Sequence, residues 1–281
     1  MVQLNLKEEN LALSSGVGLA GQAVSLFWEG YAYIAFGMYP DEIINSIVKP
    51  NKLTAVHIYL YSLQDISQEV DNLRKNLDDL EEVYNFISRT LNEVNLYPDL
   101  PVPNFEECEG DEHGHWDDNC SCSKALKKWI DYVEKNSTKI NNLIVHSAFQ
   151  FLFQDRQFLH DFHLELADWV EDNMQYIEEN YSDYLVAKKR FRRQHFPVWL
   201  KQAVLYRDKG TCVLCRADLS KLMRTINNVH IDHIVPLDVY GSNDASNMQL
   251  LCATCNTKKG ARSTKTSKMN APFWNLDIVL D

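Results

Sequence analysis

The chain has 281 residues, of which 45% are hydrophobic and 24% are charged, as in an ordinary globular protein with a sizeable core. The net charge of −11 by itself argues against a nucleic-acid partner. The distribution of charge reverses that conclusion, because residues 188–281 carry +9 and residues 1–187 carry −20. This asymmetry predicts two domains, of which the basic one is the candidate for a polyanion partner.

Cysteine usage indicates a reducing compartment. Four of the seven cysteines form two close pairs within residues 212–255, and the other three are Cys108, Cys120 and Cys122. An odd number of cysteines, some beside histidines, fits metal-binding or free thiols better than a secreted disulfide framework. The N-terminus also lacks the basic start and apolar run of a signal peptide. We therefore expect a cytoplasmic protein.

Residues 16–38 form a long apolar stretch whose length would suit a membrane span. Gln22, Ser25 and Glu29 fall inside it, however, and a central acidic residue is costly in lipid. The stretch therefore favours a buried helix over a membrane segment.

Residues 62–97 carry apolar side chains at alternating spacings of four and three. The positions are Ile66, Val70, Leu73, Leu77, Leu80, Tyr84, Ile87, Leu91 and Val94. This heptad pattern predicts one long helix whose apolar seam faces another helix, ended by the prolines that follow. The seam suits either an antiparallel hairpin within the chain or a coiled coil between two copies.

Residues 105–124 are irregular and acidic and contain Cys108, His113, His115, Cys120 and Cys122. Their spacings match no common zinc module, so an exposed loop and a metal site both stay open. Helical patterns return at 125–153 and 156–181. We expect residues 1–185 to be an acidic α-helical domain with a regulatory or partner-binding role.

Residues 186–281 are expected to form the second, basic domain. The domain begins with the run at 188–193, in which five of six residues are basic. Such a run suits a solvated linker or a phosphate contact. A short amphipathic helix follows from Trp199 and ends at Gly210.

The strongest pattern lies at residues 212–260. Cys212-x2-Cys215 and Cys252-x2-Cys255 are separated by 36 residues and can form a closed, tetrahedral, structural zinc site. Between them, residues 229–235 alternate and are rich in β-branched residues, which predicts a strand ended by Pro236 and paired with a second strand. The segment from Asn247 to Cys252 is expected to be helical or knuckle-like, and a short helix is expected from Asn256.

The combination of motifs resembles the HNH endonuclease family, also called ββα-metal or His-Me finger nucleases. The motifs are Arg207-Asp-Lys-Gly-x-Cys-x-x-Cys, Asp232-His-Ile-Val-Pro, and Asp244-x-x-Asn247-x-Gln-Leu-Leu-Cys-x-x-Cys-Asn256-x-x-Lys259-Gly. The resemblance covers roughly residues 196–262. It implies a mainly α protein in which a helical domain accompanies a small, zinc-stabilised α+β nuclease domain.

The resemblance also implies roles for individual residues. His233 would be the general base, and Asp232 and Asn256 would hold a catalytic Mg²⁺ or Mn²⁺. The family often has His where this chain has Asn256, and an amide oxygen suits a hard cation such as Mg²⁺. Asn247 would fix the loop behind His233, whereas His230 could bind metal, touch phosphate or lie on the strand surface.

The expected activity is metal-dependent hydrolysis of DNA. The backbone phosphates would be contacted by Lys188, Arg190, Arg192, Arg193, Lys258, Lys259 and Arg262. Two other functions stay open: a non-catalytic zinc-ribbon module that binds nucleic acid, and an effector nuclease masked by its own acidic half. The family resemblance also suggests phage defence or mobile elements, with a second copy or a helical protein such as an ATPase as partner.

Overall fold

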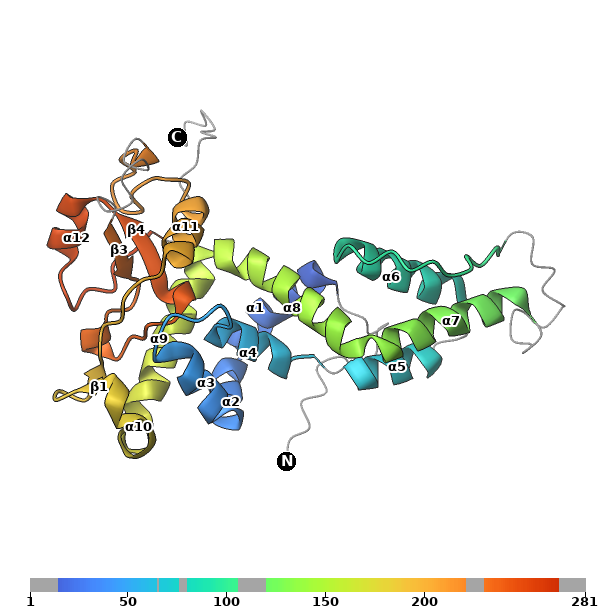
Figure 1. Cartoon of the computed structure of the whole chain (residues 1–281), viewed down its shortest axis with the longest axis horizontal. Helices are drawn as coiled ribbons and strands as arrows, with labels where there is room; N and C mark the ends of the chain where they lie inside the picture. Colours follow the sequence, from blue (N-terminus) through green and yellow to red (C-terminus); the bar gives the residue numbers. More distant parts are fainter. Residues whose placement is uncertain (1–14, 65, 76–79, 106–119, 221–229, 268–281) are drawn as a thin grey trace, which may run out of the picture. The chain divides into compact units, whose positions relative to one another are not determined.

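The computed structural model describes residues 15–64, 66–75, 80–105, 120–220 and 230–267. It is mainly helical with a small α+β region near the C-terminus, which confirms the expected fold class. The chain divides into two compact units (Figure 1). Unit 1 comprises the described residues within Met1–Ala23 and Leu60–Phe151, and unit 2 those within Val24–Tyr59 and Leu152–Asp281.

The regular elements follow one another in a simple order. The helices are α1 (Gly16–Trp28), α2 (Tyr31–Met38), α3 (Pro40–Ile47), α4 (Ala55–Ser62), α5 (Ile66–Lys75), α6 (Leu80–Glu93), α7 (Ser121–Lys135), α8 (Ser137–Gln154), α9 (Arg156–Asp172), α10 (Met174–Tyr181), α11 (Val198–Arg207) and α12 (Ala253–Lys259). The strands are β1 (Leu185–Val186), β2 (Arg190–Phe191), β3 (His230–His233) and β4 (Met248–Leu251), and short 3-10 helices include η4 (Leu237–Val239) and η5 (Ala245–Asn247).

The heptad seam is buried within unit 1. Its buried members are Ile66, Val70, Leu73, Leu80, Ile87, Leu91 and Val94. Helices α5 and α6 both pack against α7, and Arg74 on α5 donates to Glu134 on α7 at 2.7 Å. This arrangement favours packing within the chain, while pairing of two copies stays a prediction. The middle of the expected helix, residues 76–79, lies outside the described residues.

The apolar stretch at 16–38 forms two helices, α1 and α2, rather than one. Gly30 separates them with a φ of 85°, a left-handed conformation that glycine adopts at low cost. In unit 1, Gly16 also allows a close approach to α8, because a Cβ there would lie 2.2 Å from the Ser147 hydroxyl oxygen. Among the described residues, no helix combines the length and apolar content that a membrane crossing requires.

The Cys/His segment at 105–124 falls largely outside the described residues, including Cys108, His113 and His115. Cys122 is described and buried, and its thiol donates to the carbonyl of Asn104. The helical pattern that follows is confirmed, with breaks at Asn136, Asp155 and Asn173 that divide it into α7, α8, α9 and α10.

Helices α2 and α9 form an aromatic core in unit 2. Phe36 contacts Phe162 edge-to-face with ring centroids 5.3 Å apart, and it also contacts Trp169. Asp155 caps α9 by accepting a hydrogen bond from Phe158 N at 2.9 Å, and this cap fixes where the helix begins. The result is a rigid helical layer beside the C-terminal elements of the same unit.

The C-terminal elements surround a two-stranded sheet. β3 and β4 pair antiparallel and lie between α11, which packs on β4, and α12, which packs on β3 (Figure 1). One apolar cluster joins them and includes Phe196, Leu200, Val204, Ile231 and Leu250. A small core of this kind needs further stabilisation, such as a metal clamp or a supporting layer.

One expectation about local structure needs correction, and one segment left open by the sequence is now described. Residues 185–191, at the start of the basic run, form a β1–β2 hairpin with Phe191 buried and Lys189 at a positive φ of 55°. Residues 248–251 form β4 rather than a helical or knuckle segment, because every residue of β4 is buried and can satisfy its backbone against β3. The sequence did not indicate this strand, because a polar residue, Gln249, occupies one of its buried positions and interrupts the hydrophobic pattern.

The compact units do not follow the expected boundary at 185/186. Helices α2, α3, α9 and α10 belong to the same unit as the C-terminal sheet, although they precede the boundary in sequence. The division into a helical domain at 1–185 and a nuclease domain at 186–281 therefore stays a prediction about function.

Candidate functional site

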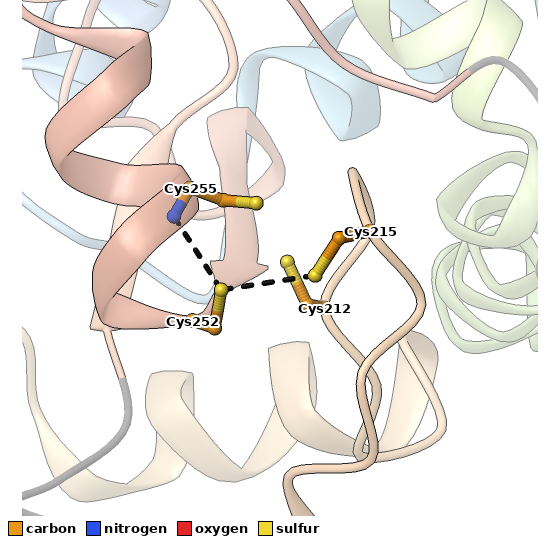
Figure 2. Close-up of side chains that lie close together, drawn as sticks. All are labelled: Cys212, Cys215, Cys252 and Cys255. Atoms are coloured by element: carbon orange, nitrogen blue, oxygen red, sulfur yellow. Dashed lines mark hydrogen bonds between the residues drawn. The ribbon is translucent and has the colours of Figure 1, made fainter.

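The four paired cysteines come together at the end of β4. Cys252 and Cys255 follow this strand directly, and Val213 N donates to the carbonyl of Leu250 at 3.0 Å. This bond brings the turn at residues 212–215 beside the first turn of α12. Figure 2 shows the four sulfur atoms gathered between that turn and the start of α12. All four lie within 4.8 Å of one another.

The geometry and the thiol chemistry both suit zinc. In a tetrahedral site with zinc–sulfur distances of about 2.3 Å, sulfur atoms lie roughly 3.8 Å apart. The Cys215 and Cys252 sulfur atoms are 3.7 Å apart. Within the described ranges, no other group of histidine, cysteine and acidic side chains has metal-binding geometry. The expected closed, structural zinc site fits these four residues.

The thiols also indicate that a cation is needed. Burial acts to raise the pKa of Cys212, but backbone hydrogen bonds from Cys252, Cys215 and Leu214 lower that pKa to about 7. Burial and the neighbouring thiols raise the pKa of Cys255 to about 12. One thiolate is therefore favoured and four together are not, unless a cation neutralises them.

The strand β3 carries the three acid–base candidates. His230 and Asp232 lie on one face and His233 on the other, because side chains alternate along a strand. Asp232 pairs with Gln249 and His233 with Met248 across the sheet. The expected strand and its pairing with a second strand are thus confirmed.

Lys259 holds the Asp232 carboxylate. Its ammonium nitrogen lies 2.9 Å from Asp232 Oδ2 and donates to the carbonyl of His233 at 2.8 Å. The lysine side chain is fully buried and the aspartate side chain is 16% exposed. Apart from this ion pair, Asp232 Oδ2 forms no hydrogen bond within the described residues. Lys259 is thus part of the site itself, and its expected phosphate contact stays a prediction.

His233 is 3% exposed and packs edge-to-face against Phe196, with ring centroids 5.6 Å apart. Burial and then the positive charge of Arg193 lower the pKa of His233 to about 4, against the opposing charge of Asp232. The imidazole is therefore neutral near pH 7. Its Nε2 atom has no hydrogen-bond partner within the described residues, so the ring can accept a proton.

Asn247 fixes the loop that follows His233. Its side chain accepts a hydrogen bond from Val235 N at 2.9 Å and donates to the carbonyls of Val235 and Ser242 at 3.0 and 2.9 Å. Gly241 allows the loop to close, because a Cβ there would lie 1.9 Å from the Val235 oxygen. The loop-fixing contacts expected of Asn247 are therefore present.

The loop at 242–247 is also bound by the helical layer of unit 2, which the sequence did not indicate. Asp244 Oδ2 accepts a hydrogen bond from Ala55 N at 2.7 Å, at the start of α4. Asp244 Oδ1 accepts from the Ser246 hydroxyl at 2.5 Å, and His163 Nε2 lies 2.9 Å from that same hydroxyl. Because Ser246 donates to Asp244, His163 must be the donor to Ser246. All three side chains are buried.

A second buried connection joins α9, α11 and β4. Asp208 Oδ1 accepts from Arg207 Nε at 2.7 Å and from the guanidinium of Arg156, while Asp208 Oδ2 accepts from Leu250 N at 2.8 Å. The Arg207-Asp208 motif therefore has a structural role, tying the strand beside the site to two helices. Its sequence signal was visible, but its partner Arg156 lies 52 residues away.

Asn256 and His230 lie at the edges of the site. Asn256 is half-buried on α12, one turn before Lys259 and therefore on the same face of the helix. Because α12 packs on β3, this face lies against the strand that carries Asp232. His230 is half-buried and shares a face with Asp232. The roles of both residues stay predictions.

Most of the expected phosphate-contacting residues are on the surface. Lys188, Arg192, Arg193, Lys258 and Arg262 are exposed. Arg190 is half-buried, and its guanidinium lies 3.2 Å from the centre of the Tyr240 ring. Arg190 Nε also donates to the carbonyl of Asp238 at 3.2 Å. Its guanidinium is thus engaged with η4 in this structure.

A comparison with protein families matches the region that contains the four cysteines and β3. The model of the HNH endonuclease family matches residues 212–262, which include both cysteine pairs, β3, β4 and α12. No curated protein and no solved structure matches the chain. The cysteine clamp and the paired strands agree with that match: residues 212–262, in the C-terminal part of this chain, match the HNH endonuclease family.

Proposed function

We propose that this protein is a metal-dependent nuclease that hydrolyses phosphodiester bonds of DNA. One observation carries the proposal. Asp232 and His233 are adjacent on β3: His233 Nε2 is buried without a hydrogen-bond partner in the described residues, and Asp232 Oδ2 has the Lys259 ammonium group as its one partner there. Burying polar atoms without partners costs free energy, so such atoms mark a site that a ligand completes.

The donor set fits a hard divalent cation. The Asp232 carboxylate and the Asn256 amide offer oxygen ligands from β3 and α12, and oxygen is what Mg²⁺ and Mn²⁺ prefer. A divalent cation bound there would neutralise negative charge on the scissile phosphate and on the leaving 3′-oxygen. Lys259 fixes the Asp232 carboxylate, and Asn256 belongs to the helix α12.

The remaining chemistry falls to His233. Its imidazole is neutral near pH 7, so Nε2 can take a proton from the attacking water. Phe196 holds one side of the ring, and the carbonyl of His233 accepts from Lys259 and Gln249 at 2.8 and 3.3 Å. These contacts support a fixed position for the base. His230, on the face of Asp232, is proposed to touch metal or phosphate.

DNA is proposed to approach over the exposed basic residues. Lys188, Arg192 and Arg193 stand on or after the β1–β2 hairpin, and Lys258 and Arg262 stand at the end of α12. Contacts to phosphate supply affinity and orientation without reading sequence. The Arg193 guanidinium lies 5.3 Å from the centre of the Phe196 ring, which packs against His233, and this contact supports a place for Arg193 near the site.

A non-catalytic, nucleic-acid-binding zinc module is the second candidate. It is favoured by the nearly complete burial of His233, which a merely structural residue would share. A plasmid-cleavage assay with Mg²⁺, Mn²⁺ or chelator separates the two. We expect nicking that needs the divalent cation and that His233→Ala abolishes without changing zinc content. His146→Ala, an exposed histidine of unit 1, is the control and should cleave normally. Cleavage retained by His233→Ala would refute the catalytic role.

The acidic N-terminal half is proposed to regulate the nuclease or to bind a partner. Candidate partners are a second copy of the chain and a helical protein such as an ATPase, in phage defence or on a mobile element. The charge difference between −20 and +9 also permits electrostatic self-masking. Measuring the mass of the intact protein in solution tests pairing, and raising salt should increase DNA binding only if masking operates.

A further inference from the structure

The turn between α3 and α4 is a basic surface inside the acidic half of the chain. Residues 48–54 include Lys49 and Lys52, both exposed, and no acidic residue. The turn has a defined shape, because Asn51 Oδ1 accepts a hydrogen bond from Leu53 N at 3.2 Å. This turn belongs to unit 2, together with the HNH endonuclease domain.

Asn243 fastens this turn to the nuclease loop. Its backbone N–H donates to the carbonyl of Ile47 at 2.9 Å, and its side-chain nitrogen donates to the carbonyl of Val48 at 3.1 Å. The same nitrogen donates to the carbonyl of Arg192 at 3.0 Å. One amide group therefore holds the backbone before Lys49 and the backbone before Arg193 side by side. Asn243 is fully buried, so these bonds are shielded from water.

Lys52 lies beside α11. Its ammonium nitrogen lies 6.0 Å from the centre of the Trp199 ring on α11. That distance is at the outer limit of a cation–π interaction and still leaves the ammonium group exposed. Lys49 and Lys52 thus stand next to the segment 192–199, which leads from the basic hairpin to α11.

The surroundings of the turn are basic. Arg192 and Arg193 are exposed on the neighbouring segment, and Arg193 lies over Phe196 at 5.3 Å, the ring that contacts His233. The nearest acidic group in the loop, Asp244, is fully buried and engaged with the start of α4. A phosphate chain that reaches His233 past Arg193 would therefore meet two further lysines and no exposed acid of this turn or loop.

We propose that Lys49 and Lys52 bind the phosphate backbone of the nucleic acid and extend the binding surface onto the helical part of the chain. This inference rests on the proposed function. It gives the acidic half a direct share in substrate binding, through a turn that the 186–281 segment does not contain. Each lysine would contribute one phosphate contact and no sequence preference.

The test compares two charge reversals in the full-length protein. Lys49→Glu with Lys52→Glu changes the turn, and Lys135→Glu with Lys139→Glu makes the same charge change at exposed positions of unit 1. Binding to a labelled duplex of about 30 base pairs is measured by fluorescence anisotropy at several salt concentrations without added divalent cation. Loss of two phosphate contacts should make the negative slope of log affinity against log salt shallower by about 2.

Each outcome decides the proposal. A shallower salt dependence and at least a tenfold loss of affinity, both in the turn variant alone, support the proposal. An unchanged slope, or equal losses in both variants, overturns it while leaving the nuclease proposal intact. If the unchanged protein binds no duplex and does not cleave plasmid, both proposals fail. If the turn variant shows no thermal unfolding transition, the double variant Lys49→Gln with Lys52→Gln replaces it. The change in its slope of log affinity against log salt then decides the proposal in the same way.

Discussion

Lys259 offers the sharpest test of how the site is built. Its buried ammonium group is shared between Asp232 and the carbonyl of His233. In Lys259→Met the stem is replaced by a side chain of similar length, and the carboxylate loses its counter-charge. Removing one partner of a buried ion pair costs about 3–5 kcal/mol. Because the Asp232 side chain is 16% exposed, we expect the lower end of that range, about 3 kcal/mol.

The same substitution should change the response to metal. If a divalent cation and the Lys259 ammonium group compete for Asp232, removing the ammonium group should tighten cation binding. A tenfold gain in affinity would add up to about 1.4 kcal/mol of stabilisation at saturating cation. Urea unfolding of the unchanged protein and of Lys259→Met, each with and without Mn²⁺, measures the loss of stability and the stabilisation by the cation. Neither measurement depends on cleavage.

Lys258→Met is the matched control, since Lys258 is the preceding residue on α12 and is exposed. Surface substitutions of this kind usually change stability by less than about 0.5 kcal/mol. The reasoning is refuted if both variants unfold at the same urea concentration. Equal stabilisation of Lys259→Met and the unchanged protein by Mn²⁺ would instead refute competition for Asp232.

Two further predictions follow from the clamp and from the buried histidine. Cys252→Ser should abolish zinc binding and the folded state of residues 196–262, because binding of a structural zinc ion is coupled to folding. Native mass spectrometry measures the bound zinc, and amide exchange measures the folded state. A folded, zinc-free variant would contradict the prediction. Burial and the charge of Arg207 lower the pKa of His163 from 6.5 to about 3. Between these two pH values the His163 imidazole is protonated in the unfolded chain and neutral in the folded one. The free energy of unfolding therefore falls by up to about 1.4 kcal/mol per pH unit as pH drops below 6.5. His163→Gln keeps a donor for Ser246 and should flatten the loss of urea resistance between about pH 7 and 5. Burial raises the pKa of Asp244, so this residue instead adds to the free energy of unfolding as pH falls, and it does so equally in both proteins. An unchanged pH dependence of urea unfolding in the variant would refute the assignment to His163.

The contacts around residues 242–247 bear on the role of the helical part. Asp244 and Ser246 are bound by the start of α4 and by His163 of α9, and Asp208 is bound by Arg156 of the same helix. A segment that only masked the proposed nuclease would touch its exposed basic surface. These contacts instead reach buried positions behind β3 and β4, which favours a scaffold for the site.

The sequence by itself determined the local parts of this protein. The spacing of the cysteines predicted the clamp, and alternation at 229–235 predicted β3. These patterns are short in range, because knuckles and strands place their side chains by local geometry. The order of the motifs along the chain was also sufficient to indicate the resemblance to HNH endonucleases.

Only the tertiary structure decided how these parts are supported. The bonds from Asn243 to Val48, from Asp244 to Ala55 and from Arg156 to Asp208 join residues far apart in sequence. Polar residues at 242–247 look the same in sequence whether they face water or fill a buried network. Lys259 is similar: its charge suggested a phosphate contact, and only the packing of α12 on β3 buried its ammonium group against Asp232.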